Sequence, residues 1–113
     1  MRLVYALAAA LALGMSAQTA SAAEASVAIS SPKSGATFAP KSDIEIAYKI
    51  ALGDKGDHTH LYVDKDEALT LRGLEGTHVL SGLAPGTHDI CIKVVNKAHT
   101  PIGAQECIQV SVQ

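Results

Sequence analysis

One segment in the first half of the chain alternates strictly between larger apolar residues and smaller or charged ones. Ile44, Ile46, Tyr48, Ile50 and Leu52 alternate with Glu45, Ala47, Lys49 and Ala51. Because successive side chains of a β-strand point to opposite faces, this period of two predicts a strand with one buried face. It is the clearest secondary-structure signal in the sequence.

The chain after residue 22 continues as short strand patterns separated by turn residues, with no convincing helix. The predicted strands are 26–30, 44–52, 58–64, 68–72, 77–80, 87–95 and 104–112. About seven short strands with regular turns in about 90 residues are typical of an immunoglobulin-like fold. We therefore predict an all-β protein, an antiparallel β-sandwich. The predicted core residues are Ile44, Ile46, Ile50, Leu61, Val63, Leu83, Ile90, Ile92, Val94, Ile108 and Val110.

The N-terminal residues have the pattern of a secretory signal. Met1-Arg2 gives a positive start, an apolar run follows from Leu3 to Leu13, and small residues end in Ala20-Ser21-Ala22. The apolar run is too short to span a bilayer. We predict a signal peptide over residues 1–22, which is cleaved, and an Ig-like β-sandwich domain over residues 23–113, located in a periplasm or secreted.

Charge and aromatic content exclude several kinds of partner. Of the nine Lys and Arg residues, Arg2 lies in the predicted signal, which leaves eight against eleven Asp and Glu residues. A slightly acidic chain has no general attraction to nucleic acid or to acidic lipid. Aromatic residues make up 4% of the chain and tryptophan is absent, which argues against a platform for stacking sugars or bases. We expect no nucleic-acid partner and no stable membrane insertion after signal cleavage.

Cys91 and Cys107 are the only cysteines. In an oxidising compartment an even pair predicts a disulfide, which we favour over a thiolate metal site. The residue pattern places Cys91 and Cys107 on the more polar faces of their strands. If these strands form a hairpin centred near His99, the two cysteines lie opposite each other on its outer face.

Other segments carry a family resemblance. Ser31–Ala36 and Leu83–His88 resemble the opening and the next-to-last strand of bacterial Ig-like and fibronectin type III-like modules. The combination of His58-x-His60-Leu61-Tyr62-Val63-Asp64 with Leu-x-Pro-Gly-x-His resembles a narrower group. These are small bacterial periplasmic Ig-like domains of unknown function. The resemblance covers most of residues 23–113 and implies the sandwich fold, but it implies no activity.

The segment His58-Thr59-His60 places two histidines on one face of a predicted strand, about 7 Å apart. In an Ig-like sandwich this strand pairs with 87–95, so its start lies beside the loop that carries His99. Three imidazoles suit zinc or copper, with Asp57 as a possible additional ligand. Histidines on surface strands also often bind nothing, and the sequence leaves both interpretations open.

Copper is the preferred metal and zinc the alternative. Exported sandwich proteins commonly handle copper, and imidazole affinity peaks at Cu(II) among divalent ions. Both methionines, Met1 and Met15, lie in the predicted signal, so a copper site would be rich in nitrogen and oxygen ligands.

The remaining two histidines have different predicted roles. His88 stands where Leu-x-Pro-Gly-x-Tyr sequences place the tyrosine of a tyrosine corner, which predicts a partly buried structural residue. It should lie at the opposite end of its strand from His99. His78 lies on a short strand of the other sheet and has the weakest claim to a function.

Nothing in the sequence indicates an enzyme. Gly-x-Ser-x-Gly, phosphate-binding loops and dinucleotide fingerprints are absent, and Asp64–Glu67 lacks the ligand spacing of a calcium loop. Two hypotheses remain. The first is an exported metal-binding protein for sequestration or delivery of copper to another exported protein. The alternative is a non-catalytic interaction or accessory module that binds no metal.

Overall fold

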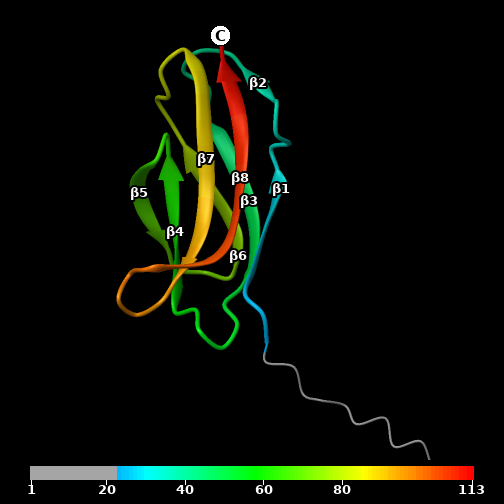
Figure 1. Ribbon diagram of the computed structural model, residues 1–113. Coiled ribbons are helices and arrows are strands. Elements are labelled where there is room, and N and C mark those ends of the chain that lie inside the picture. The colour runs from blue at the N-terminus through cyan, green and yellow to red at the C-terminus, as the bar shows by residue number, and fades with distance from the viewer. Residues whose placement is uncertain (1–22) are drawn as a thin grey trace, which may run out of the picture.

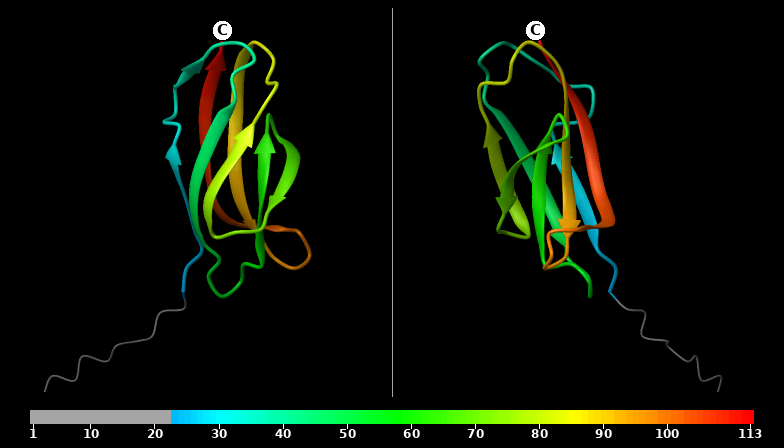
Figure 2. Two further views of the ribbon diagram at one scale, coloured as in Figure 1. Left: turned by 180° about the vertical axis from the view of Figure 1, so that it is seen from behind. Right: turned by 60° about the vertical axis from the view of Figure 1, so that its left-hand side comes forward.

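The computed structural model describes residues 23–113, which form two β-sheets packed face to face (Figure 1 and Figure 2). The strands are β1 (Ser26–Ser31), β2 (Thr37–Phe38), β3 (Ile44–Ala51), β4 (His58–Val63), β5 (Asp66–Leu71), β6 (Glu75–Leu80), β7 (Gly86–Val95) and β8 (Pro101–Val112). One sheet has the order β1-β3-β6, and the other has the order β2-β8-β7-β4-β5. All pairings are antiparallel except that of β2 with β8. The predicted immunoglobulin-like β-sandwich is confirmed.

The described part of the chain has eight strands rather than about seven. The additional strand, β2, has two residues and pairs in parallel with the end of β8. Such a short edge strand has no periodicity that a sequence pattern could reveal. The strand predicted at 68–72 begins earlier, at Asp66, because Asp64 and Lys65 form a two-residue hairpin turn with positive φ angles of 52° and 73°.

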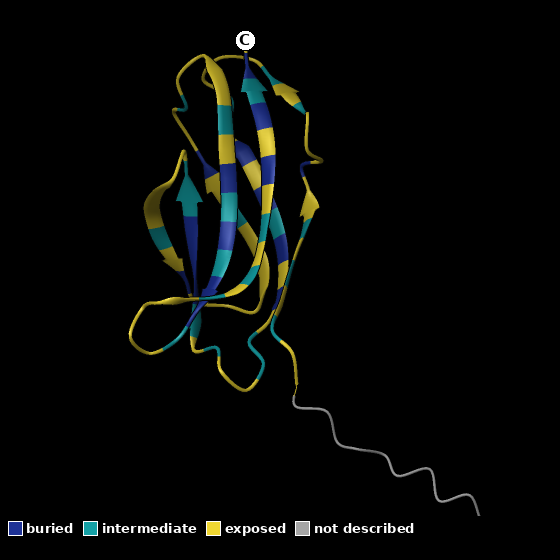
Figure 3. Cartoon of the chain, in the orientation of Figure 1, coloured by how far each residue is buried: buried dark blue, intermediate teal, exposed yellow. Residues whose placement is uncertain are grey.

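The core lies between the inner faces of the two sheets, and buried and exposed residues alternate along the long strands (Figure 3). Nine of the eleven predicted core residues are buried: Ile44, Ile46, Ile50, Leu61, Ile90, Ile92, Val94, Ile108 and Val110. Val63 and Leu83 are only half-buried and pack against the edge of the core. Val63 is the last residue of β4, and Leu83 lies in the loop before β7, so neither is covered from all sides.

The disulfide joins Cys91 of β7 to Cys107 of β8, and the two residues are direct partners in the strand register. Their Cα atoms are 4.1 Å apart. The bridge lies on the outer face of the five-stranded sheet, as the alternation of the two strands predicts. It therefore links neighbouring strands of one sheet and lies outside the mainly apolar core between the sheets.

No helix in residues 23–113 has the length and apolar character needed to cross a membrane. The predicted signal peptide, residues 1–22, lies outside the described residues.

Candidate metal centre

Strand β4 positions His58 and His60 on the outer face of the five-stranded sheet. Thr59, which lies between them, and Leu61, which follows His60, point inward and are buried. His60 is also buried, with an exposed fraction of only 1%, although it lies on the outer face. Other side chains must therefore cover it, which distinguishes this face from an ordinary solvent-exposed strand surface.

The cover is provided partly by the loop between β7 and β8. Antiparallel pairing places His58 opposite Val95, so the start of β4 lies beside the end of β7 (Figure 1). The Asn96 side-chain oxygen accepts hydrogen bonds from the amides of Ala98 and Thr100, at 2.9 and 3.0 Å. This tight loop holds His99 at a φ of 62°, a left-handed conformation that is uncommon outside glycine but more frequent for histidine.

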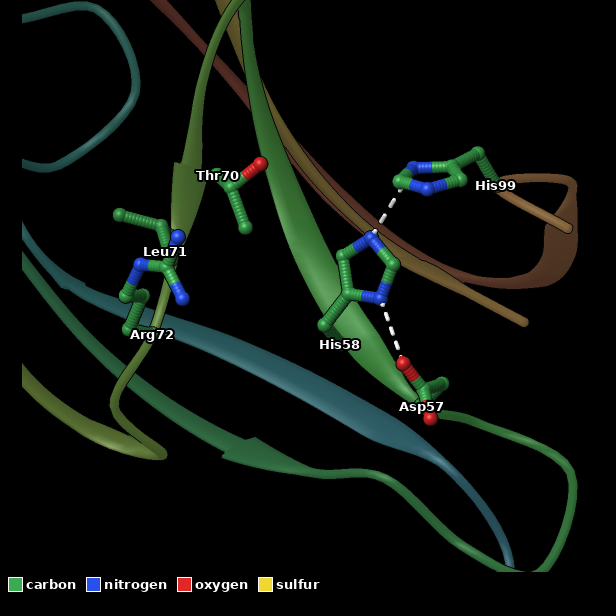
Figure 4. A pocket seen from close by; sticks show the side chains of 6 residues that line it. All are labelled: Asp57, His58, Thr70, Leu71, Arg72 and His99. Carbon is green, nitrogen blue, oxygen red and sulfur yellow. Dashed lines mark hydrogen bonds and ion pairs between the residues drawn. The ribbon is translucent and has the colours of Figure 1, made fainter. Parts of the chain in front are cut away.

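The three histidines predicted to form a site converge in the structure. The His58 Nε2 atom lies 2.9 Å from His60 Nε2 and 3.3 Å from His99 Nδ1. The distance between His99 Nδ1 and His60 Nε2 is also 3.3 Å. Figure 4 shows the rings of His58 and His99 turned toward each other. One nitrogen from each ring therefore points to a common centre.

These distances fit one transition-metal ion. One ion could bind all three nitrogens at the usual metal–imidazole distance of about 2.0–2.1 Å. Three imidazoles would leave further coordination positions of a zinc or copper ion open to other ligands. His58, His60 and His99 form the single cluster of this kind among residues 23–113.

Two carboxylates contact the opposite nitrogens of the paired histidines. Asp57 Oδ2 lies 2.9 Å from His58 Nδ1, and Glu67 Oε1 lies 3.2 Å from His60 Nδ1. Carboxylates in these positions accept the Nδ1–H groups, so each Nε2 presents a lone pair to the centre. Asp57 therefore lies behind a histidine rather than at the centre, where the sequence had placed it as a possible ligand.

Glu67 was not predicted as a member of the site. A bulge in the pairing of β4 with β5 follows Leu61, so that Tyr62 faces Glu67 rather than Ala68. Bulges commonly re-aim a side chain, and this one brings the Glu67 carboxylate to the His60 ring. A single sequence contains no signal for such a shift in register.

Burial lowers the pKa of His60 below its ordinary value of 6.5. The Glu67 carboxylate opposes this effect, whereas His58 and His99 add to it. Burial also raises the pKa of Tyr62, whose hydroxyl lies 3.5 Å from His60 Nδ1. Burial therefore favours the neutral form of the His60 imidazole, which is the form that ligates metals.

Gly56 permits the loop before β4 to approach the end of β7. Its amide donates a hydrogen bond to Leu52, and the next amide, of Asp57, donates one of 2.8 Å to Val95. A Cβ atom at Gly56 would lie 2.6 Å from the Val94 side chain. Asp57 and the start of β4 therefore depend on this glycine for their position.

A cleft of about 340 Å³ opens beside the histidines (Figure 4). His58 and His99 line one part of it, and Thr70, Leu71 and Arg72 line another. His60 does not line it. Two of the three histidines are therefore accessible from the cleft, and the third is not.

His88 lies away from this site, at the start of β7. Its ring contacts the Asp64 carboxylate at 2.6 Å through Nδ1 and the Ala84 carbonyl at 2.6 Å through Nε2. The second contact resembles the bond of a tyrosine corner to the backbone upstream. These two hydrogen bonds raise the pKa of His88, with the Ala84 carbonyl the larger cause, and the bond to His88 lowers the pKa of Asp64. His78 pairs with Ile46 in the other sheet.

The sequence matches no model of a known protein family and no curated protein. Solved structures do resemble the fold. Fibronectin(III)-like modules of CbhA from Clostridium thermocellum align with 77% of this chain and 95% of theirs, at 15% identity and a TM-score of 0.63. The domain is fibronectin type III-like in fold.

Two other structures are similar to a lesser degree. An engineered protein aligns with 80% of this chain and 20% of its own, at 18% identity and a TM-score of 0.55. A lytic polysaccharide monooxygenase of Jonesia denitrificans aligns with 70% of this chain and 58% of its own, at 18% identity and a TM-score of 0.46. At these identities the similarities to the CbhA modules and to the engineered protein concern the fold alone, and the similarity to the monooxygenase is too low to support an inference about this chain.

Proposed function

We propose that this protein binds one transition-metal ion through His58, His60 and His99, with Cu(II) preferred over Zn(II). One observation carries the proposal. The Nε2 atoms of His58 and His60 lie 2.9 Å apart while the Nδ1 atoms of both rings face carboxylates. With Nδ1–H bonded to a carboxylate, each Nε2 offers only a lone pair, and two lone pairs at this distance repel each other. A cation between them removes the repulsion.

The preference for copper rests on the ligand set. All three ligands are imidazoles, both cysteines are joined in the disulfide, and the two methionines lie at positions 1 and 15. Without a thiolate or thioether, the site does not suit Cu(I). Imidazole nitrogen suits both Cu(II) and Zn(II), and affinity in the divalent series is highest for Cu(II).

We infer that the bound ion is stored or passed to another exported protein. His99 comes from an exposed loop, so movement of that loop would remove one of three ligands. The remaining coordination positions would face the cleft, where an incoming ligand can attack. The disulfide agrees with a periplasmic or secreted location, because such bonds persist in oxidising compartments.

Isothermal titration of the metal-stripped protein with Cu(II) and Zn(II) tests the proposal. We expect one ion per chain at micromolar affinity or tighter, and tighter binding of Cu(II). His99→Ala changes an exposed side chain and should weaken binding at least about tenfold, or ~1.4 kcal/mol. His58→Ala combined with His60→Ala should abolish it.

His78→Ala is the matched control, because it removes a histidine from the other sheet. Circular dichroism of each variant shows whether the fold is intact. Absence of binding by the wild-type protein, or equal binding by all variants, would contradict a metal site at these histidines.

A second candidate function, an accessory module that binds a partner protein, is favoured by one feature. Leu74 and Val79 are 52% and 44% exposed, and both lie on or beside β6, an edge strand of the three-stranded sheet. Val79→Lys would disrupt partner binding at this edge and leave metal uptake unchanged. The histidine variants would have the opposite effects.

A further inference from the structure

The cleft beside the three histidines contains a second cationic group, Arg72, which follows the end of β5. Figure 4 shows Thr70, Leu71 and Arg72 on one side of the view, with His58 and His99 on the other. Both Arg72 and Thr70 are exposed, and the guanidinium has no carboxylate within ion-pair distance among the described residues. It is therefore available to a ligand that enters from solvent.

The charges around the cleft favour an anion only after the metal has bound. Without an ion, the cleft is lined by one cation, Arg72, and one carboxylate, Asp57, so the formal charges of its lining sum to zero. A divalent ion held by three neutral imidazoles adds two positive charges. Asp57 is already hydrogen-bonded to His58 Nδ1, at 2.9 Å, so it cannot move to the open side of the ion without leaving that contact.

We propose that the metal-loaded cleft binds a carboxylate group, with one oxygen on the ion and the other at Arg72. The proposal rests on the metal-binding function proposed above and specifies its open coordination position. A carboxylate suits this arrangement because its two oxygens can bridge an ion and a guanidinium, and Arg forms strong charge-assisted hydrogen bonds to it. The Thr70 hydroxyl offers a further hydrogen-bond donor.

The position of His60 determines the direction of approach. His60 is 1% exposed and lies outside the cleft lining, so it closes the inner side of the centre. An external ligand in the cleft then lies between His58 and His99 on one side and Arg72 on the other. The carboxylate can belong to a small acid or to an acidic side chain of a partner that receives the metal. The cleft, at about 340 Å³, has room for either group.

Acetate is the probe, titrated into the Cu(II)-loaded protein while the visible absorption and the electron paramagnetic resonance spectrum of the copper are followed. We expect saturable binding of one acetate with a changed copper spectrum, and no binding to the metal-free protein. Arg72→Ala should weaken acetate binding about tenfold, because it removes a hydrogen bond between charged groups. Arg72→Lys should retain part of the affinity.

Lys97→Ala is the matched control, since it removes one positive charge from the neighbouring loop but from outside this cleft. Its acetate affinity should stay within about twofold of wild type, because exposed charges at a distance are screened by salt. Cu(II) affinity is titrated first for every variant. Failure of copper to bind would overturn the metal site itself. Normal copper binding without an acetate response, or equal losses in the Arg72 and Lys97 variants, would overturn the carboxylate site alone.

A blocked Gly-Asp-Gly tripeptide distinguishes the two sources of the carboxylate. Competition by the tripeptide at a concentration similar to that of acetate would indicate that a protein side chain fits the cleft. Binding of acetate without competition by the tripeptide would restrict the ligand to small acids.

Discussion

The Asp57 carboxylate should increase the metal affinity of the proposed site without itself binding the ion. Asp57→Ala tests this effect. Its Oδ2 atom holds His58 Nδ1 at 2.9 Å and so keeps the proton away from Nε2. Loss of such an outer partner weakens metal binding about 10–100-fold. We expect the lower end of this range, because Asp57 is 41% exposed and water can replace part of the hydrogen bond. Tenfold corresponds to ~1.4 kcal/mol.

The assay compares Cu(II) titrations of the wild type, Asp57→Ala and Asp54→Ala. Asp54 lies in the same loop and carries the same charge, but within residues 23–113 it forms no hydrogen bond or ion pair with a histidine. The control should therefore change the affinity by less than about twofold, since distant exposed charges are screened. Equal affinities of Asp57→Ala and wild type would refute the reasoning about the His58 proton. Equal losses in both variants would assign the effect to net charge.

Three further predictions concern stability. The Cys91–Cys107 disulfide closes a loop with a sequence separation of 16, so its reduction should lower the free energy of unfolding by about 3 kcal/mol. The melting temperature should fall by about 10 °C or more, with unchanged strand content by circular dichroism. Identical melting with and without reductant would contradict this. Gly56→Ala should destabilise the fold by about 1–3 kcal/mol in urea unfolding, because the added methyl group would collide with Leu52 and Val94. An unchanged urea midpoint would contradict this explanation. The His88–Asp64 pair should stabilise the fold fully between pH 3.8 and 6.5, the ordinary pKa values of Asp and His. The stabilisation is lost as the pH rises through the raised pKa of His88, and also as the pH falls through the lowered pKa of Asp64. Asp64→Asn should therefore cost more at about pH 5.5 than at about pH 9, and equal costs at both would count against the pair.

The fold was predictable because its strands obey a local rule. The period of two in β3, β7 and β8 reports which residues face the core. The pairing of β7 with β8 follows from the short loop between them, whereas β3 pairs with β1 and β6 in the other sheet. The register of Cys91 with Cys107 follows from the same alternation. Val63 and Leu83 were misplaced because burial at a strand end or in a loop depends on neighbours that a local pattern does not contain.

The convergence of the three histidines was predictable, but their surroundings were not. His58 and His60 share a face by strand geometry, and antiparallel pairing brings His99 to the same end of the sheet. The burial of His60 and the role of Glu67 depend on the path of one loop and on a bulge beside Leu61. Both are tertiary features, so the sequence could not distinguish a covered histidine cluster from histidines on a bare strand.

The distribution of stabilising interactions suits a protein that gains and loses a metal without unfolding. The core is formed by apolar side chains between the sheets, and the disulfide binds β7 to β8 on the outer face, so neither depends on the histidines. This differs from small zinc domains, in which metal binding supplies the folding free energy. The loop that carries His99 begins and ends in the strands that the disulfide joins. The proposed site therefore combines two histidines held on a strand of the sheet, His58 and His60, with a third, His99, on a loop.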